Sequence, residues 1–257
     1  MGEVPTSHPR YRSLMSRKQM VEAASKGMLA DSALIAHGRG EAFDYLLNES
    51  TCEAAIKAIS EVAMRLLVAE RPVLSLNGNT TALAGDVMIA CAAVLDCPIE
   101  INIYYRTPER MVALVDYLNS LRDDAKKLLP EVMGKKVDEV KILGNAPDGQ
   151  IPNLEGPRAN CHTEGILAAD VILVPLEDGD RCEALIAMGK TVCVIDLNPL
   201  SRTARMATVT IVDELTRCAP LLLNALIENR LLDTEKWDNE KNLQNALNVM
   251  LGNLAEG

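Results

Sequence analysis

Polar and charged side chains follow four apolar segments of this sequence, and their types suit the binding of an anionic small molecule. The four groups are Asn77-Gly78-Asn79-Thr80, Arg106-Thr107, Glu177-Asp178-Gly179-Asp180-Arg181 and Asn198-Pro199-Leu200-Ser201-Arg202. Any one of them could be an ordinary turn, since Asn-Gly and Asp-Gly are common turn formers. If the apolar segments are parallel strands, however, their carboxyl ends share the sheet edge where ligands bind. The four loops together therefore predict a small-molecule site.

A basic cluster lies within the first 40 residues, which also contain two of the three histidines. Acids occur there at positions 3, 22 and 31, whereas Lys or Arg occurs at positions 10, 12, 17, 18, 26 and 39. Arginine binds phosphate with two parallel hydrogen bonds, and glycine lets backbone N–H groups approach an anion. The run His37-Gly38-Arg39-Gly40, with a helix start predicted at Gly40–Asp44, therefore indicates a phosphate contact at a helix N-terminus. A solvated basic helix explains the earlier lysines well and this run less well.

Five carboxylates near the third and fourth loops form an acidic group: Glu177, Asp178, Asp180, Glu183 and Asp196. Because Mg²⁺ takes one or two carboxylates together with substrate phosphates, this group could hold a magnesium ion. The same side chains could instead bind ribose hydroxyls. For Asp178 and Asp180 a third explanation is a helix N-terminus stabilised by acids.

Standard nucleotide, metal and nucleophile motifs are missing from the sequence. Gly189-Lys190-Thr191 resembles the end of a P-loop, but Ala184 stands where that motif requires its first glycine. No GxGxxG follows the first apolar segment, the histidines lack metal-ligand spacing, and the seven cysteines include no CxxC pair. The sequence thus predicts phosphate recognition without a standard nucleotide motif and without a protein-bound metal centre.

The elements that would position these groups alternate between strands and helices. Short apolar strands are predicted at 73–76, 99–105, 140–143, 171–176, 191–197 and 208–212. Helices are predicted over 13–27, after a capping box at Ser50–Glu53, after Thr107-Pro108, and over 215–232 and 233–254. Continuously apolar strands that alternate with helices indicate an α/β fold, with a parallel sheet covered by helices on both faces.

The composition describes an acidic protein with an aliphatic core. Among 257 residues, 36 are acidic and 26 basic, a net charge of −10, and only 3% are aromatic. This balance disfavours nucleic-acid binding, which needs a basic surface and often stacking aromatics. No apolar run approaches the roughly 18 residues that cross a bilayer. Since the N-terminus also lacks a signal-like stretch and the cysteines suit a reducing compartment, we expect a cytoplasmic protein.

One α/β domain is expected to account for residues 1–257. Residues 1–70 form a helical part that contributes to the site, 71–230 form the core, and 231–257 form a C-terminal helix. The apolar residues of that last helix fall on one face: Leu243, Leu247, Met250, Leu251 and Leu254. We expect this face to pack on the protein's own core, and a subunit interface is the alternative.

Five segments together resemble the archaeal phosphopantothenate synthetases, the 4-phosphopantoate–β-alanine ligases of coenzyme A biosynthesis. They are Ser7–Tyr11, Ala36–Tyr45, Asn77–Asn79, Val174–Arg181 and Asp196–Ala204. The resemblance extends from about residue 4 to about residue 225. It departs from the family pattern at Cys182, where threonine is expected, and at Thr81, where the family is more apolar.

The resemblance implies a Rossmann-like core, a homodimer and an ATP-dependent condensation. The reaction joins 4-phosphopantoate to β-alanine through an acyl-adenylate and gives 4-phosphopantothenate, AMP and pyrophosphate. The resemblance also implies that Arg17, Arg39 and the segments Asp178–Glu183 and Asn198–Arg202 contact ATP. A phosphotransferase acting on a small acid and a non-catalytic nucleotide sensor remain as alternatives.

Adenylyl transfer between anions needs charge neutralisation and alignment, which arginines and Mg²⁺ supply. We assign catalytic roles to His37, Arg39 and Arg181. Nucleotide binding is assigned to Arg17, Arg39, Asp178, Gly179, Asp180, Arg181, Glu183, Asn198, Pro199, Ser201 and Arg202. Substrate binding is assigned to His8, Arg10, Asn77, Gly78, Asn79, Thr80 and Arg106.

Overall fold

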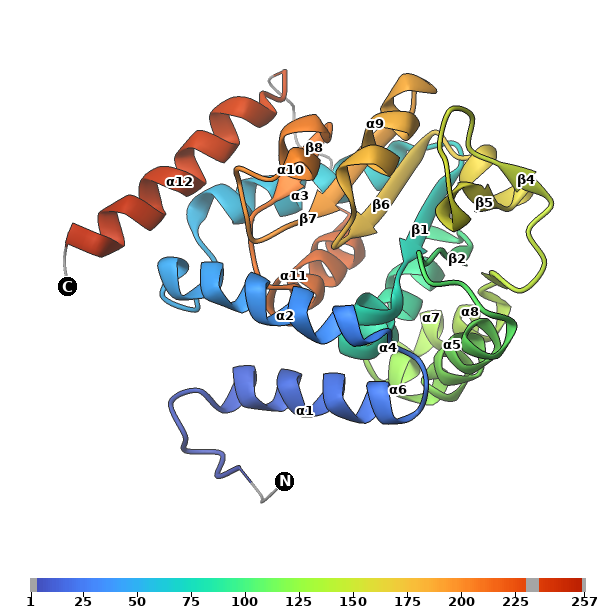
Figure 1. Cartoon of the computed structure of the whole chain (residues 1–257), viewed down its shortest axis with the longest axis horizontal. Helices are drawn as coiled ribbons and strands as arrows, with labels where there is room; N and C mark the ends of the chain where they lie inside the picture. Colours follow the sequence, from blue (N-terminus) through green and yellow to red (C-terminus); the bar gives the residue numbers. More distant parts are fainter. Residues whose placement is uncertain (1–3, 230–235, 256–257) are drawn as a thin grey trace.

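The computed structural model describes residues 4–229 and 236–255 and contains a six-stranded parallel sheet with helices on both faces (Figure 1). The strands lie in the order β3-β2-β1-β6-β7-β8, and every neighbouring pair is parallel. Counted along the chain, this is the 3-2-1-4-5-6 order of the Rossmann fold. The predicted α/β class and Rossmann-like core are confirmed, and β1 and β6 flank the point where the strand order reverses.

The strands of this sheet occur where the sequence predicts them. Their bounds are β1 (Pro72–Leu76), β2 (Ile99–Ile101), β3 (Ile142–Leu143), β6 (Val171–Pro175), β7 (Thr191–Ile195) and β8 (Val209–Ile211). The prediction that the second strand reaches Tyr105 is wrong, because both neighbours of β2 end beside it and leave no further ladder partner. A small antiparallel pair, not predicted, interrupts the loop after Gly144: β4 (Gly149–Gln150) and β5 (Asn160–Cys161).

Successive strand residues point to opposite faces and feed two separate cores. Leu74 and its counterparts pack against α3 (Glu53–Val68), α4 (Gly78–Leu95), α5 (Pro108–Ser120) and α11 (Leu215–Glu228). Val73 and its counterparts pack against α9 (Gly179–Ala187) and the short η3 segment (Thr163–Leu167). The predicted aliphatic packing on both sides of the sheet is therefore present.

Helix α4 corrects one expectation about apolar runs. Its 18 residues are long and apolar enough to cross a membrane by length and composition, which the sequence analysis did not anticipate. The helix is nevertheless 72% buried inside the protein, packed between the sheet and neighbouring helices. Its hydropathy is that of a core helix.

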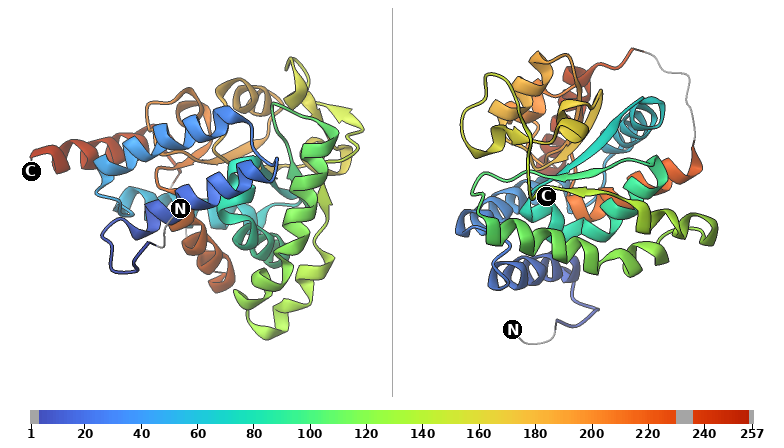
Figure 2. Two further views of the ribbon diagram at one scale, coloured as in Figure 1. Left: turned by 60° about the horizontal axis from the view of Figure 1, so that its bottom comes forward. Right: turned by 90° about the vertical axis from the view of Figure 1, so that its right-hand side faces the viewer.

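Two N-terminal helices lie across the carboxyl ends of the strands (Figures 1 and 2). They are α1 (Tyr11–Ser25) and α2 (Asp31–Asp44), which run side by side in opposite directions. The predicted helix start at Gly40–Asp44 is wrong, because these residues form the last turns of α2. The backbone N–H groups of Gly38 and Gly40 lie inside that helix and are not a free anion-binding nest.

The predicted capping box at Ser50–Glu53 is also wrong. Helix α3 has Cys52 as its N-cap, without a side-chain cap hydrogen bond. Ser50 Oγ donates to the Leu47 carbonyl, and Thr51 Oγ1 donates to Asp213 at 2.6 Å. The Ser50 hydroxyl that the local pattern assigned to the start of α3 is thus bonded to the preceding turn instead. The predicted cap at Thr107 is confirmed, since its Oγ1 accepts from the Arg110 N–H.

The C-terminal helix, α12 (Asn239–Ala255), packs on a small core of its own. Leu243, Ala246 and Met250 meet Leu47 and Val212 there, which confirms packing on the protein's own core. Leu251, predicted on the same face, is 56% exposed and does not join this core. The predicted helical stretches over 230–235 lie outside the described residues. The remaining short helices are α6 (Arg122–Lys127), α7 (Glu131–Gly134), α8 (Lys136–Glu139), α10 (Arg202–Met206), η1 (Tyr45–Leu47) and η2 (Pro157–Ala159).

Gly78, the first residue of α4, is required by close packing. A Cβ there would stand 2.8 Å from Leu29 Cδ2 and 3.2 Å from the Met28 carbonyl oxygen, in the turn between α1 and α2. We expect Gly78→Ala to lower the free energy of unfolding by about 1–3 kcal/mol, because overpacking displaces that turn. Urea unfolding measures the change.

Gly38→Ala is the matched control, because a Cβ at Gly38 meets nothing within 4 Å and the residue lies inside a helix. It should leave the protein unchanged or raise its stability by about 0.5–1 kcal/mol. Equal unfolding midpoints for the two variants would contradict the packing explanation.

Candidate active site

A cavity of about 740 Å³ lies between the carboxyl edge of the sheet and the helices α1 and α2. At the switch point it is lined by Asn77 and Gly78 after β1 and by Leu176 and Glu177 after β6. Parallel α/β sheets bind their ligands at this place. The loop after β7 also lines the cavity, so three of the four predicted strand-end loops meet here, whereas Arg106 and Thr107 do not line it.

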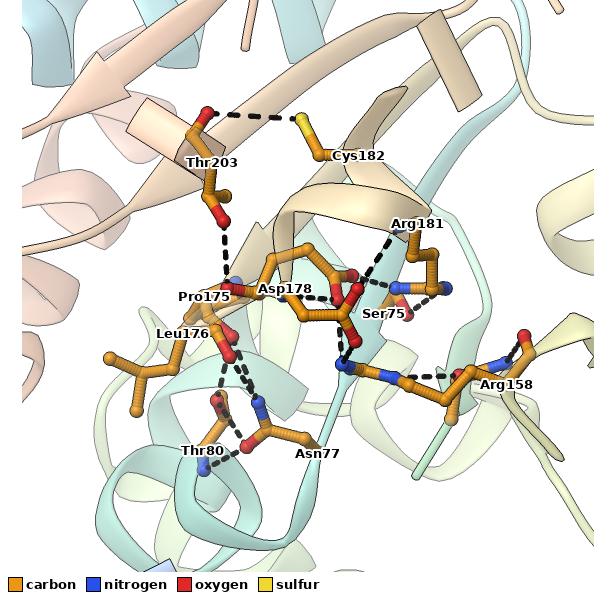
Figure 3. A network of polar contacts seen from close by, with 12 residues as sticks. Ser75, Asn77, Thr80, Arg158, Pro175, Leu176, Asp178, Arg181, Cys182 and Thr203 are labelled. Atoms are coloured by element: carbon orange, nitrogen blue, oxygen red, sulfur yellow. Dashed lines mark hydrogen bonds and ion pairs between the residues drawn. The ribbon is translucent and has the colours of Figure 1, made fainter. Parts of the chain in front are cut away.

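Asn77 ties the two central strands together at the floor of the cavity (Figure 3). Its Oδ1 accepts from the Thr80 N–H at 3.0 Å, which caps α4. Its Nδ2 donates to the carbonyls of Pro175 at 3.1 Å and Leu176 at 2.9 Å. Leu176 itself has φ of 57°, a left-handed conformation that is uncommon for leucine. The amide of Asn77 is therefore used to hold the ends of β1 and β6 in register.

Arg181 does not line the cavity, contrary to its predicted role. Its side chain is fully buried, where it donates to Glu177 and, at 2.9 Å, to Ser75 Oγ (Figure 3). Asp178 is the N-cap of α9, and the first turn of that helix directs Arg181 into the core. Direct contact between Arg181 and a triphosphate is thus not what the structure shows.

Arg158 lines the cavity in its place, although no prediction from the sequence includes this residue. The residue belongs to η2, in the loop inserted between β3 and β6, and it pairs with Glu177 at 2.8 Å and with Asp178. Although burial opposes ionisation, Arg158 lowers the pKa of Asp178. Glu177 is therefore held between two arginines, one from the core side and one from the cavity side.

The acidic group is largely neutralised by arginines and does not form a metal centre. Asp180 and Glu183 pair with Arg202 outside the cavity, and the Arg202 side chain covers Gly179. Within residues 4–229 and 236–255, no three His, Cys, Asp or Glu side chains are grouped to hold a metal ion. For Asp178, the explanation as a helix cap is confirmed.

Asp196 is the member of that group that faces the cavity without an arginine partner among the described residues. Its carboxylate accepts from Ser201 Oγ at 2.5 Å and from the Asn198 N–H at 2.9 Å. Burial raises the pKa of Asp196. One carboxylate in the cavity fits a magnesium ion that arrives with nucleotide phosphates, since Mg²⁺ keeps most of its other ligands from water and phosphate.

Glu41 of α2 accepts hydrogen bonds from two residues of α1 and from the N-cap residue of that helix. It accepts from Ser13 Oγ at 2.8 Å, from Arg17 at 2.7 to 3.0 Å, and from Arg10 at 3.3 Å. Although burial opposes ionisation, the hydrogen bonds of Arg17 and Ser13 lower the pKa of Glu41. Arg17 does not line the cavity, because this bidentate pair holds it along the helices.

A second ion pair anchors the end of α2 to the sheet. Arg217, which lines the cavity, donates to Asp44 at 2.6 and 3.1 Å and to Asp213 at 3.0 Å. The sequence analysis missed Arg217, although it follows the last strand at the same sheet edge as the predicted loops. Because ligands bind at the carboxyl ends of parallel strands, the segment after β8 would have indicated Arg217 as a further candidate.

The arginines of the cavity divide into two kinds. Arg10, Arg158 and Arg217 are paired with carboxylates. Within the described residues, the other cavity arginines make no ion pair: Arg12, Arg39 and Arg110. Their charges are uncompensated, so the cavity favours an anionic ligand.

His37 lines the same cavity, and its Nε2 has no hydrogen-bond partner within the described residues. Burial lowers the pKa of His37 below the ordinary 6.5. Its imidazole is therefore neutral at pH 7 and able to accept a proton.

The cavity gathers part of the predicted site. It includes Arg10, His37, Arg39, Asn77, Gly78, Asn79, Asn198 and Ser201. The remaining predicted residues do not line it: His8, Arg17, Thr80, Arg106, Asp178, Gly179, Asp180, Arg181, Glu183, Pro199 and Arg202. The two segments expected to contact ATP nevertheless meet beside the cavity, where Arg202 reaches over the start of α9.

Hydrogen bonds account for the positions of three of these residues. Arg106 donates to the Gly144 carbonyl, Thr80 Oγ1 is buried against the Pro175 carbonyl, and His8 Nδ1 accepts from the Arg10 N–H. Cys182, which replaces the expected threonine, is buried with its Sγ 3.9 Å from the Thr203 carbonyl oxygen. It faces the core and not the cavity.

Known proteins resemble this chain over nearly all of its length. The family model for phosphopantothenate/pantothenate synthetase matches residues 54–253. A 4-phosphopantoate–β-alanine ligase of Thermococcus onnurineus is 44% identical, covering 100% of this chain and 97% of that protein. The Thermococcus kodakarensis ligase of the same name is 44% identical over 96% and 92%. The Methanosarcina mazei ligase is 43% identical over 84% and 79%.

Proposed function

The chain belongs to the phosphopantothenate/pantothenate synthetase family, and from that premise we propose that its cavity is where 4-phosphopantoate, ATP and β-alanine react. The protein is a 4-phosphopantoate–β-alanine ligase, an enzyme of coenzyme A biosynthesis. The observation that carries the location is the cavity at the switch point, with three unpaired arginines on its wall within the described part of the chain. Two of the three substrates are phosphorylated, which suits this excess of positive charge.

The reaction proceeds in two steps in this proposal. The carboxylate oxygen of 4-phosphopantoate attacks the α-phosphorus of ATP, and pyrophosphate leaves with the electrons of the broken P–O bond. The amine of β-alanine then attacks the acyl carbonyl carbon and gives up a proton as the amide forms, and AMP leaves with the electrons of the broken C–O bond. Both steps concentrate negative charge, so neutralisation and alignment are the main catalytic demands.

The loop after β7 suits the nucleotide. Asp196, Asn198 and Ser201 give this wall of the cavity its polar groups, and the neighbouring start of α9 extends it. Arg39 would neutralise the phosphates from α2 above them. Mg²⁺, when it accompanies ATP, would neutralise phosphate charge, and Asp196 is the carboxylate that fits it.

The floor of the cavity suits the carboxylate of 4-phosphopantoate. The N-terminus of α4, an 18-residue helix, opens on the cavity at Gly78 and Asn79. Helix N-termini favour anions through their free N–H groups and dipole. The carboxylate would then lie near the nucleotide wall, since only β6 separates β1 from β7 in the sheet.

Product analysis tests the reaction. The protein is incubated with ATP, Mg²⁺, 4-phosphopantoate and β-alanine, and we expect 4-phosphopantothenate, AMP and pyrophosphate in equal amounts. ADP as the sole nucleotide product would favour the phosphotransferase alternative. Nucleotide binding without turnover would favour the sensor.

His37 is the proposed proton acceptor for the β-alanine amine. We expect His37→Gln to slow overall ligation by about 10²-fold or more, the usual contribution of a general base. Exchange of labelled pyrophosphate into ATP should continue, because adenylate formation needs no base. His162→Gln is the control, since His162 lies outside the cavity. Equal losses in both assays for His37→Gln would contradict the assignment.

A homodimer is proposed from the outer face of α2. Leu34, Ile35 and Ala42 are exposed and fall on one helical stripe, with Ile35 67% exposed. An exposed apolar stripe of this kind suits a second copy of the chain. Sedimentation should give twice the chain mass of 27.9 kDa. We place the enzyme in the cytoplasm, where its seven free cysteines would stay reduced.

A further inference from the structure

The cavity wall that follows β2 differs from the polar wall that follows β7. Its side chains are aliphatic and aromatic: Ile103, Tyr104 and Tyr105. The chain has only five Tyr, one Phe and one Trp, yet two adjacent tyrosines stand here. They are 56% and 55% exposed, with ring centroids 5.1 Å apart in an edge-to-face arrangement. An aromatic pair left open on a cavity wall indicates contact with an apolar part of a ligand.

Arg110 stands at the same wall with an unneutralised charge. Its guanidinium donates to the carbonyls of Tyr105 at 2.6 Å and Leu29 at 3.4 Å, and it makes no ion pair within the described part of the chain. Its Nε is buried and has no hydrogen-bond partner there. The carbonyl bonds fix the position of the guanidinium and use one N–H of each terminal nitrogen, so the second N–H of each and the whole charge are left for an anion.

Helix geometry strengthens this anion site. Arg110 lies in the first turn of α5, whose N-cap is Thr107. The dipole of α5 therefore adds to the charge of the guanidinium. Leu29, whose carbonyl accepts from Arg110, also packs against Gly78 at the start of α4. Leu29 thus contacts both the Arg110 site and the proposed carboxylate site.

We propose that this wall binds the phosphorylated end of 4-phosphopantoate, an inference that rests on the proposed function. Arg110 binds the 4-phosphate, and Tyr104 and Tyr105 cover the carbon that carries two methyl groups. The substrate has a carboxylate at one end, a phosphate at the other and the dimethyl carbon between them. The α4 N-terminus, the tyrosines and Arg110 all line the cavity, so each of these three groups has a matching partner there. The wall therefore sets the substrate specificity of the ligase.

Selectivity between two substrates tests the tyrosines. The wild type and the variants Tyr104→Ala and Tyr105→Ala are assayed with 4-phosphopantoate and with 2-hydroxy-4-phosphobutanoate, which lacks both methyl groups. The wild type should favour the dimethyl substrate in kcat/KM, and each alanine variant should reduce that preference by about tenfold. Tyr117→Ala on α5 is the control, because Tyr117 does not line the cavity. Its selectivity should equal that of the wild type.

Arg110→Met tests the phosphate contact separately. It should raise KM by about tenfold or more for both phosphorylated acids, because a charge-assisted contact is lost. KM for ATP and for β-alanine should not change. A rise in KM for ATP alone would overturn the proposal.

Failure of this inference is distinguishable from failure of the proposed function. If the wild type forms no 4-phosphopantothenate, the function is wrong. If the wild type ligates while the tyrosine variants keep full selectivity, the subsite is wrong and the function stands. A change in oligomeric mass with unchanged selectivity would also overturn the subsite.

Discussion

Replacing Arg39 with alanine should reduce ligation by about 10²-fold or more and leave the unfolding temperature unchanged. Arg39 lines the cavity from α2, is exposed, and makes no ion pair with any described residue. Its removal therefore breaks no contact that stabilises the fold. A guanidinium aimed at phosphate matters most when charge moves onto the departing pyrophosphate, so kcat should fall together with kcat/KM.

The measurement compares steady-state ligation with thermal unfolding for the same preparations. Arg205→Ala is the matched control, because Arg205 is exposed on α10 and does not line the cavity. That variant should keep both activity and unfolding temperature. Full ligation by a folded Arg39→Ala protein would remove Arg39 from the nucleotide site. A large fall in its unfolding temperature would assign it a structural role instead.

The sheet could be predicted because its strands are buried on both faces. A strand such as Val171–Pro175 is continuously apolar, and such runs separated by helices leave few alternatives to a parallel sheet. The strand order then follows from the connections, and the ligand position follows from the strand order. Sequence reasoning could not show where β2 ends, because that depends on the length of its neighbours.

Helix α2 could not be predicted because its pattern is reversed. Its outer face carries exposed Ile35 and Ala42, whereas its inner face directs His37, Glu41 and Asp44 toward the cavity or its ion pairs. Prediction of an amphipathic helix assumes an apolar inner face. A helix that lines a polar cavity violates that assumption, so its glycines were interpreted as a loop before a new helix.

Arginine orientation is the other limit of sequence reasoning. Arg39 and Arg181 occur in equally polar segments, and residue type alone assigns both to phosphate. The structure separates them, since one faces the cavity and the other is buried beside Glu177. Arg158 carried no local signal at all, because an irregular loop between two short strands brings it to the switch point. The different positions of Arg39 and Arg181 can be tested by comparing the unfolding of a variant at each residue.

Replacing Arg181 with methionine should lower the free energy of unfolding by about 3 kcal/mol, roughly 6–12 °C in unfolding temperature for a chain of this size. The side chains of Arg181 and Glu177 are both 0% exposed. Methionine restores much of the volume, so the loss measures the buried charge and the Ser75 hydrogen bond. Arg158 still pairs with Glu177, which keeps the expected loss at the lower end for a broken buried pair.

Arg202→Met is the matched control for Arg181→Met, because Arg202 pairs with Asp180 and Glu183 while its side chain is 59% exposed. Exposed pairs contribute about 0–1 kcal/mol, so this variant should unfold near the wild-type temperature. Below its own transition, Arg181→Met should ligate far better than Arg39→Ala. If Arg181→Met instead kept full stability and lost ligation as Arg39→Ala does, Arg181 would act on substrate directly and the buried pair would be unimportant for folding.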